Sequence, residues 1–321
     1  GAYLRDLRER RSLSLDDVES LSSAFPDPIG KAYLSRCENG KLKIAFSKTI
    51  ALGKIYEVPS EVLAERMRLD LELDRIGGPD TAGKTYKKMF RTAWDASHEG
   101  RPWVAYAFAR DGVPLSNFTP LIDHASNSDQ QRLAARLSVA SMAAGLGANR
   151  YAMFEFESID QAVLSDYHRA GLLDRLQVQH RIRGDLEHAA NLGDAALALS
   201  RERGFDGQIP LLLESRARTF LSAKELDRAI EYQQEAIQRF DRIEPRDNKR
   251  VGAYLRLAEL QRLLERSDEA NVLLVRAADA RADGFAVAET LSTAALGGAL
   301  QLADVGLTVT PVPAQGLSLI H

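Results

Sequence analysis

Residues 32–40 read Ala32-Tyr-Leu-Ser-Arg-Cys-Glu-Asn-Gly40, and this stretch decides the fold of the N-terminal part of the chain. It favours a short helix that ends at the glycine, because glycine readily takes the left-handed conformation that closes helices. A preceding helix is predicted to start behind Ser14, a good N-cap that acidic residues follow in the first turn. Another helix is predicted over Thr49–Pro59. Residues 1–58 therefore predict several short helices in succession.

This arrangement resembles the helix-turn-helix domain of the Cro/repressor type, or XRE family, whose recognition helix closes in a Ser-Arg-x-Glu-x-Gly pattern followed by basic residues. Here the pattern runs from Ser35 to Gly40, and Lys41 and Lys43 follow it. The resemblance implies a DNA-binding transcriptional regulator. It also implies that the third helix lies in the major groove with its N-terminal residues at the base edges.

Matching the pattern backward places the start of this helix near Gly30 and assigns its groove-facing positions. The residues expected to contact bases are Lys31, Ala32, Ser35 and Arg36. The residues expected to contact phosphate are Asn39, Lys41 and Lys43. Lysine and arginine can donate to guanine O6 and N7, and alanine can contact a thymine methyl group. Leu34 and Cys37 are predicted to point inward.

The connection between the second and third helices departs from the family's pattern. Residues Ser20–Gly30 contain Phe-Pro-Asp-Pro and exceed the tight turn of the family by about five residues. Glu19 also stands where the family usually has a small residue. Both features bear on the angle of the recognition helix. The alternative interpretation is an interaction scaffold whose N-terminal helical domain docks a protein and not DNA.

Composition and charge limit the classes of function that this chain can have. The 321 residues carry 42 Lys and Arg against 45 Asp and Glu, so the chain as a whole does not attract nucleic acid. Between Lys31 and Lys54, however, six cations stand against one acid, Glu38, which predicts a local basic patch. No apolar run reaches the roughly 18 residues of a membrane span, and the first residues lack a signal-peptide pattern, so we expect no membrane association and a cytoplasmic location. A single cysteine excludes an intramolecular disulfide.

Downstream, three segments repeat a pair of alanines at a seven-residue spacing. The pairs are Ala189 and Ala196, Ala229 and Ala236, and Ala270 and Ala277, and the first alanines lie 40 and 41 residues apart. Small residues at matched positions let helices approach closely, as stacked helical hairpins require. Residues 225–237 resemble the second helix of a tetratricopeptide repeat. A non-repetitive helical bundle is the alternative.

These observations predict an all-α chain of two domains, with a boundary at the glycine-rich break of residues 77–83. We expect a five-helix helix-turn-helix DNA-binding domain over residues 1–75 and a linker over 76–86. A tetratricopeptide-like helical repeat superhelix follows over 87–306. Residues 307–321 are predicted to form an extended tail, with a disordered tail as the alternative.

An acid and an arginine recur at one-turn or two-turn spacing on the first helix of each repeat. They are Asp174 and Arg181, Glu214 and Arg218, and Glu259 and Arg262. On the inner surface of a superhelix such groups can clamp the backbone and carboxylate of a peptide. Intrahelical ion pairs on a solvated face are the alternative. The architecture resembles peptide-responsive quorum-sensing regulators, which implies a peptide or small-molecule effector, and we expect a homodimer on duplex DNA.

Residues 78–85 match the phosphate-loop pattern G-x-x-x-x-G-K-[ST] letter for letter. A phosphate loop follows a buried strand, whereas Leu63, Met67 and Leu71 indicate a helix before it, so we interpret these residues as part of the linker. The histidines show no zinc-ligand spacing, and no Gly-x-Ser-x-Gly motif is present. We expect no metal, no cofactor and no enzymatic activity.

Overall fold

The computed structural model describes residues 1–80, 82–98, 100–112, 128–243 and 248–279, and the regular secondary structure in these ranges is entirely helical. The predicted all-α class is confirmed. The chain divides into two compact units, Gly1–Leu176 and Gln177–His321, which are described separately. The predicted limits of the helix-turn-helix domain, linker and repeat domain stay predictions, and the predicted tail over 307–321 lies outside the described residues. No helix in the described ranges combines the length and apolarity that a bilayer span requires.

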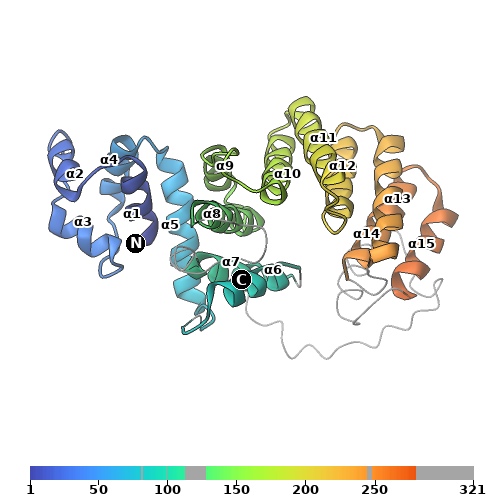
Figure 1. Cartoon of the computed structure of the whole chain (residues 1–321), viewed down its shortest axis with the longest axis horizontal. Coiled ribbons are helices and arrows are strands. Elements are labelled where there is room, and N and C mark those ends of the chain that lie inside the picture. Colours follow the sequence, from blue (N-terminus) through green and yellow to red (C-terminus); the bar gives the residue numbers. More distant parts are fainter. Residues whose placement is uncertain (81, 99, 113–127, 244–247, 280–321) are drawn as a thin grey trace. The chain divides into compact units, whose positions relative to one another are not determined.

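Five helices open the first unit (Figure 1). They are α1 (Ala2–Arg10), α2 (Leu15–Ser22), α3 (Lys31–Glu38), α4 (Phe46–Tyr56) and α5 (Ser60–Ile76). Ser14 caps α2 as predicted: its hydroxyl accepts from the backbone N–H of Asp17, whose carboxylate accepts from the N–H of Ser14. Val18, Leu34 and Leu52 are fully buried between these helices. Local capping and apolar spacing thus position these five helices.

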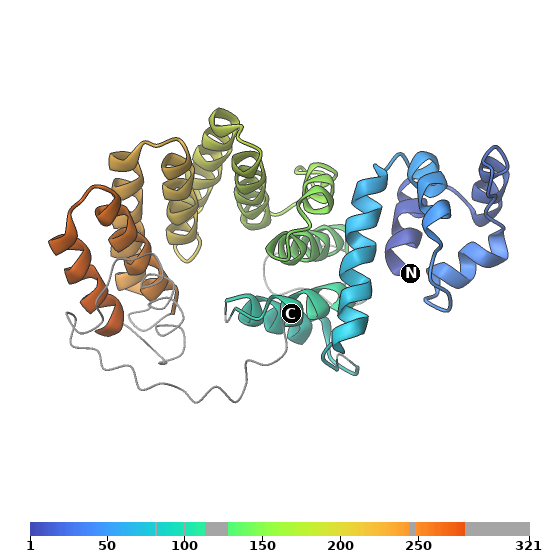
Figure 2. The same cartoon turned by 180° about the vertical axis from the view of Figure 1, so that it is seen from behind.

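Five more helices follow among the described residues, and the last of them crosses into the second unit. They are α6 (Tyr86–His98), α7 (Pro102–Gly112), α8 (Ser128–Gly145), α9 (Asn149–Glu157) and α10 (Asp166–Ile182). α6 packs against α7 and α8 against α9, while α5 packs on α9. Figures 1 and 2 both show α5 between the four short N-terminal helices and the α8–α9 pair. One hydrophobic cluster runs through α1–α5 and α6–α9, so these helices share a core.

Buried polar contacts also join α1 and α5 to α7 and α9. Arg66 of α5 donates from Nη1 to the Tyr151 hydroxyl at 2.8 Å, and its guanidinium group lies 5.2–5.5 Å from the ring centres of Tyr3, Tyr106 and Tyr151. The Tyr3 hydroxyl donates to the Glu155 carboxylate at 2.9 Å. A buried arginine needs hydrogen-bond and ring partners to offset its lost hydration, and residues far apart in the sequence supply them here.

The segment that matches the phosphate-loop pattern follows α5, a helix, as predicted. Gly77 and Gly83 both have positive φ angles, of 73° and 67°, which glycine adopts without strain. The Lys84 ammonium group donates to the backbone carbonyl of Asp80 within the same segment. Because no strand precedes it, this segment lacks the strand–loop–helix context of a phosphate loop.

The described part of the second unit contains the end of α10 and five further helices. They are α11 (Leu186–Glu202), α12 (Ile209–Ser222), α13 (Leu226–Ile243), α14 (Asn248–Leu263) and α15 (Ser267–Asp279). α12 pairs with α13 and α14 with α15, while α11 packs on α12 and α13 on α14 (Figure 2). All six alanines of the predicted repeat are at most 1% exposed. The alanine spacing therefore marks the faces on which consecutive helices meet.

Candidate functional site

The outward face of α3 carries the residues predicted to contact DNA bases. Lys31, Ala32 and Arg36 are exposed and Ser35 is half-buried. On the opposite face Leu34 and Cys37 are 0% and 2% exposed, as predicted. The buried positions of Leu34 and Cys37 on one face and the accessible polar residues on the other follow from the helical period of 3.6 residues. The structure therefore presents the four predicted base-contacting residues on one accessible helix.

Glu38, the glutamate of the Ser-Arg-x-Glu-x-Gly pattern, fixes α3 to α1. Its carboxylate accepts from Arg8 Nε at 2.7 Å and from Arg8 Nη2 at 2.9 Å. Arg8 also donates to the backbone carbonyl of Leu13 at 2.8 Å, which ties the turn before α2 to the same side chain. The hydrogen bonds to Glu38 raise the pKa of Arg8. The pattern glutamate thus positions α3 and does not face outward with Arg36.

The predicted phosphate-contacting residues lie just beyond the end of α3. Asn39 donates from Nδ2 to the Ser35 carbonyl at 2.7 Å and accepts from Arg5 Nη2 at 2.7 Å. Lys41 and Lys43 are exposed in the following turn. Gly40, with a φ of 71°, allows the chain to leave the helix at this point. Three polar side chains are therefore gathered at one end of the outward face.

The long connection between α2 and α3 is anchored at both of its ends. The Ser22 hydroxyl accepts from the N–H of Ile29, which is fully buried. Near the proline pair, Asp27 accepts from Ser47 Oγ at 2.7 Å and from Lys48 Nζ at 2.5 Å, and these contacts lower the pKa of Asp27. Lys48 also donates to the Pro28 carbonyl at 2.7 Å. The additional residues are therefore held against the first turn of α4.

Two acids of α2 contact the start of α3, and sequence reasoning missed both roles. Glu19 Oε1 accepts from the backbone N–H of Lys31 at 3.2 Å, which satisfies one of the free donors at the helix N-terminus. Asp16 Oδ1 lies 2.7 Å from Lys31 Nζ and raises the pKa of that ammonium group by hydrogen bonding. Glu19, an unusual residue at its position, was the only available signal in the sequence. Lys31, which is predicted to contact a base, is therefore paired with Asp16 in this structure.

The basic patch is smaller than the count over residues 31–54 predicts. Acids from outside that segment pair with three of its six cations: Asp16 with Lys31, Asp27 with Lys48, and Asp74 with Lys43. Lys43 Nζ and Asp74 Oδ2 are 3.0 Å apart, and both groups are mostly exposed. Within the described ranges, the other three cations, Arg36, Lys41 and Lys54, form no ion pair. Lys54 Nζ lies 5.7 Å from the ring centre of Phe25, so Arg36 and Lys41 are the cations most available to a polyanion.

The six residues of the predicted ligand groove occupy different environments. Asp174, in the first unit, is buried and lies 3.6 Å from Arg175. Glu214 is 7% exposed and pairs with Arg256 of α14, which sequence reasoning did not foresee. Arg218 and Glu259 are exposed, and Arg181 and Arg262 are half-buried. The structure therefore places one acid of the set, Glu214, in a contact between two repeats.

A buried polar cluster surrounds Glu214 in the second unit. Gln233 of α13, 1% exposed, donates from Nε2 to the Ala253 carbonyl at 3.1 Å and lies 3.4 Å from Glu214 Oε1. Arg256 donates to the same carboxylate. Elsewhere in the unit, Gln177 donates to the Thr219 hydroxyl at 2.9 Å. Glutamine on an otherwise apolar helix face was the sequence signal for these contacts.

Within the ranges that the structure covers, no group of three His, Cys, Asp or Glu side chains is arranged to hold a metal ion.

Comparison with known proteins agrees with this architecture. Residues 1–67 match the sequence model of a family described as a helix-turn-helix domain. A search of curated proteins finds no match. The crystal structure of PlcR from Bacillus thuringiensis in complex with the peptide PapR7 and DNA is similar, with a TM-score of 0.50 and 13% identity over 92% of this chain and 97% of that chain. A Podosopora anserina protein with nearly identical TPR-like repeats gives a TM-score of 0.42 and 16% identity, over 60% of this chain and 92% of that chain.

The N-terminal residues are therefore a helix-turn-helix domain. In this class of domain, the second helix of the motif enters the major groove of DNA. In its described residues the chain combines this domain with tetratricopeptide-like helical repeats, and it shares that fold with PlcR.

Proposed function

We propose that this protein is a DNA-binding transcription regulator that reads duplex DNA with α3. The observation that carries the proposal is the two-sided character of α3 within a helix-turn-helix domain. Its inner face is buried and locked to α1 through Glu38, while Lys31, Ala32, Ser35 and Arg36 remain accessible. A rigidly held helix with an accessible polar face is what recognition of base edges requires.

Within this proposal, Arg36 donates to a guanine through its two-pronged guanidinium group and Ala32 contacts a thymine methyl group. When the protein binds DNA, the Lys31 ammonium group leaves Asp16 and contacts a base. Ser35 is the fourth residue that contacts the bases. Asn39, Lys41 and Lys43 contact phosphates and set the register of the domain. No catalytic role is proposed.

The test is the salt dependence of binding to duplex DNA, measured by fluorescence anisotropy with the full chain. For a DNA-binding regulator, the logarithm of the binding constant should fall linearly with the logarithm of the salt concentration, with a slope of about −0.9 for each phosphate that the protein neutralises. The protein should also prefer one sequence isolated from genomic fragments. Weak binding without sequence preference would instead favour the alternative function, a scaffold whose N-terminal domain docks a protein.

We further infer that the repeats of the second unit bind a peptide or small-molecule effector. The likeness to PlcR, which was crystallised with a peptide and DNA, supports this role. So does the buried polar cluster around Glu214, because amide and carboxylate side chains can bind peptide backbone. The predicted groove set of Asp174, Arg181, Glu214, Arg218, Glu259 and Arg262 stays a proposal.

Homodimer formation through the repeats is also proposed, because one helix-turn-helix unit covers only a half-site. Light scattering of the full chain tests it: a dimer at micromolar concentration supports the assignment, and a monomer that binds a single half-site contradicts it. A cytoplasmic location fits a regulator of transcription and is part of the same proposal.

A further inference from the structure

The contacts between the first five helices and α6–α9 include a buried carboxylate that both groups of helices share. Glu155 of α9 is 1% exposed and accepts from the Tyr3 hydroxyl at 2.9 Å and from Arg10 Nη2 at 3.0 Å, both on α1. The same carboxylate accepts from Arg136 Nε of α8 at 3.1 Å. Burial alone would raise the pKa of Glu155, but Arg10 and Arg136 lower it on balance. One ionised side chain of α9 therefore holds α1 and α8 together.

Helix α5 makes a second set of contacts, with the connection between α8 and α9. The Glu65 carboxylate accepts from the backbone N–H of Tyr151 at 2.9 Å, which satisfies one of the free donors in the first turn of α9. Ala148, the residue before that helix, has no side chain that could do so. Arg68 Nη2 lies 3.4 Å from the Leu146 carbonyl oxygen, just beyond the end of α8. Side chains of α5 therefore bind both ends of this connection.

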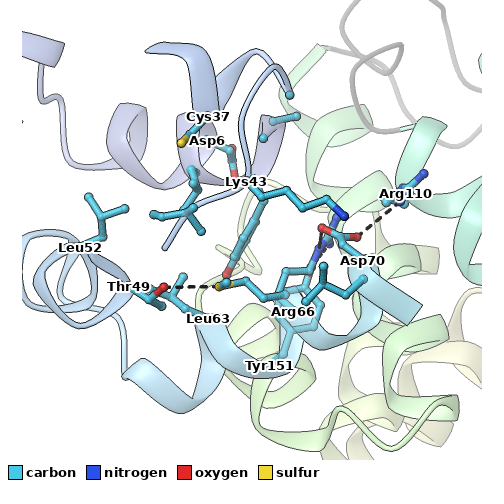
Figure 3. A pocket seen from close by; sticks show the side chains of 18 of the residues that line it. Asp6, Cys37, Lys43, Thr49, Leu52, Leu63, Arg66, Asp70, Arg110 and Tyr151 are labelled. Carbon is cyan, nitrogen blue, oxygen red and sulfur yellow. Dashed lines mark hydrogen bonds and ion pairs between the residues drawn. The ribbon is translucent and has the colours of Figure 1, made fainter. Parts of the chain in front are cut away.

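Helix α7 is joined to α5 through the charged groups that Figure 3 shows facing one another. Arg66 Nε donates to Asp70 Oδ2 at 3.3 Å, and Asp70 Oδ1 lies 3.6 Å from Arg110 Nη1 of α7. The Tyr106 hydroxyl, also on α7, donates to Asp70 Oδ1 at 3.0 Å. Because Arg66 donates to Tyr151 as well, a continuous series of contacts runs from α7 through α5 to α9.

These contacts oppose movement between the two groups of helices in two ways. The ion pairs of Glu155 and Asp70 have fixed geometry, and a small rotation would lengthen them before water could replace the lost partners. A larger separation would expose the hydrophobic cluster that α1–α5 and α6–α9 share. Parts of a chain that only a linker joins normally move against each other, whereas a shared apolar core prevents such movement.

We propose that α1–α9 form one rigid DNA-binding body, in which α8 and α9 position the helix-turn-helix domain and residues 77–85, between α5 and α6, do not act as a hinge. Glu155 and Arg66 are positioning residues, because both are buried away from the outward face of α3. The rigidity does not depend on DNA, whereas its consequence for regulation rests on the proposed function. An effector bound to the repeats of the second unit would act by moving this whole body and not by releasing the N-terminal helices.

Distances between two spin labels in the full chain without DNA test the rigidity. The labels are attached on α2 and α8 through Ser20→Cys and Arg132→Cys, both at exposed positions, and the buried Cys37 is replaced by Ala. This labelled chain should show one narrow distance distribution. Inserting Gly-Ser-Gly-Ser after Asp80 should change neither the distance nor its width, because the insertion disturbs none of the contacts above. A broad distribution in the starting chain, or broadening by the insertion, overturns the proposal.

Two matched variants of α9 test the role of Glu155. Glu155→Gln should widen the distance distribution about twofold or more, because it removes the charge that pairs with Arg10 and Arg136. Glu157→Gln removes the same charge from an exposed position and should leave the width unchanged. Equal widths for the two variants, at a helix content that circular dichroism shows to be unchanged, would contradict the positioning role of Glu155.

DNA affinity of the chain with the insertion is measured separately. It should stay within about twofold of the affinity of the starting chain, because α6–α9 and not the linker support the helix-turn-helix domain. A loss of affinity caused by the insertion would contradict the rigid body. If neither chain binds DNA, the proposed function is wrong, and the label distances still decide whether the body is rigid.

Discussion

The Arg8 guanidinium group and the Glu38 carboxylate form a two-point ion pair, with N–O distances of 2.7 and 2.9 Å, that holds α3 against α1. The Glu38 side chain is 2% exposed and that of Arg8 is 12% exposed. Paired hydrogen bonds of this kind fix orientation as well as distance. The position of α3 therefore depends on one residue of its own pattern and one from the first helix.

Replacing Glu38 with Gln should destabilise the first unit by about 2–4 kcal/mol, because the half-buried Arg8 loses its charged partner. Chemical denaturation of the full chain measures the effect. Glu9→Gln is the matched control, since Glu9 also contacts Arg8, at 3.8 Å, but is 62% exposed. Equal stability of the two variants would contradict the role assigned to Glu38.

Replacing Asp16 with Asn should tighten binding to all DNA several-fold and make the salt dependence steeper. The substitution releases the Lys31 ammonium group from its 2.7 Å ion pair and removes a negative charge near the phosphates. Glu61→Gln at the start of α5 changes the net charge equally and serves as control. If both variants gain the same affinity, total charge and not the Asp16–Lys31 contact is responsible.

Stability of the first unit should fall between pH 10 and pH 12. Burial raises the pKa of Tyr151 to about 12 from an ordinary value of 10.0, so the unfolded chain loses this proton first and is favoured as pH rises. The full contribution, about 2–3 kcal/mol, is present below pH 10 and is lost as pH approaches 12. Tyr151→Phe should flatten this pH dependence in denaturation curves. Tyr3 and Tyr106, whose pKa values burial also raises, should keep part of it. An unchanged slope in the variant would rule out Tyr151 as a contributor.

Gly193→Ala should destabilise the second unit by about 1–3 kcal/mol. A Cβ atom at Gly193 would lie 2.0 Å from Gln177 Oε1 and 2.4 Å from Arg216 Cδ, and both side chains are at most 1% exposed. Gly207→Ala, where a Cβ would meet nothing within 4 Å, is the matched control. Thermal unfolding of the full chain distinguishes the two, and similar melting temperatures would contradict the packing described for α10, α11 and α12.

The features that sequence alone predicted depend on local rules. The Ser14 cap, the inward positions of Leu34 and Cys37, and the buried alanines each follow from helix geometry and spacing within a few residues. Contacts between distant residues could not be predicted in this way. Counting charges over residues 31–54 overlooked Asp16, Asp27 and Asp74, which come from three other segments.

The same limit applied to the repeats. The spacing that places Glu214 on the first helix of its hairpin carries no information on Arg256, which lies 42 residues later on α14 and supplies its partner. Likewise, no local pattern connects Arg66 with Tyr151, 85 residues away. The helices and their buried faces were therefore predictable, whereas the electrostatic environment of the site required the fold.

The central claim is that the outward face of α3 reads DNA sequence, and the Arg36→Ala variant tests it most directly. On the preferred site Arg36→Ala should cost about 1–3 kcal/mol and relax specificity at one base position, with little effect on random DNA. Lys43→Ala should weaken binding to both DNAs about equally. Equal losses on specific and random DNA for both variants would contradict the account.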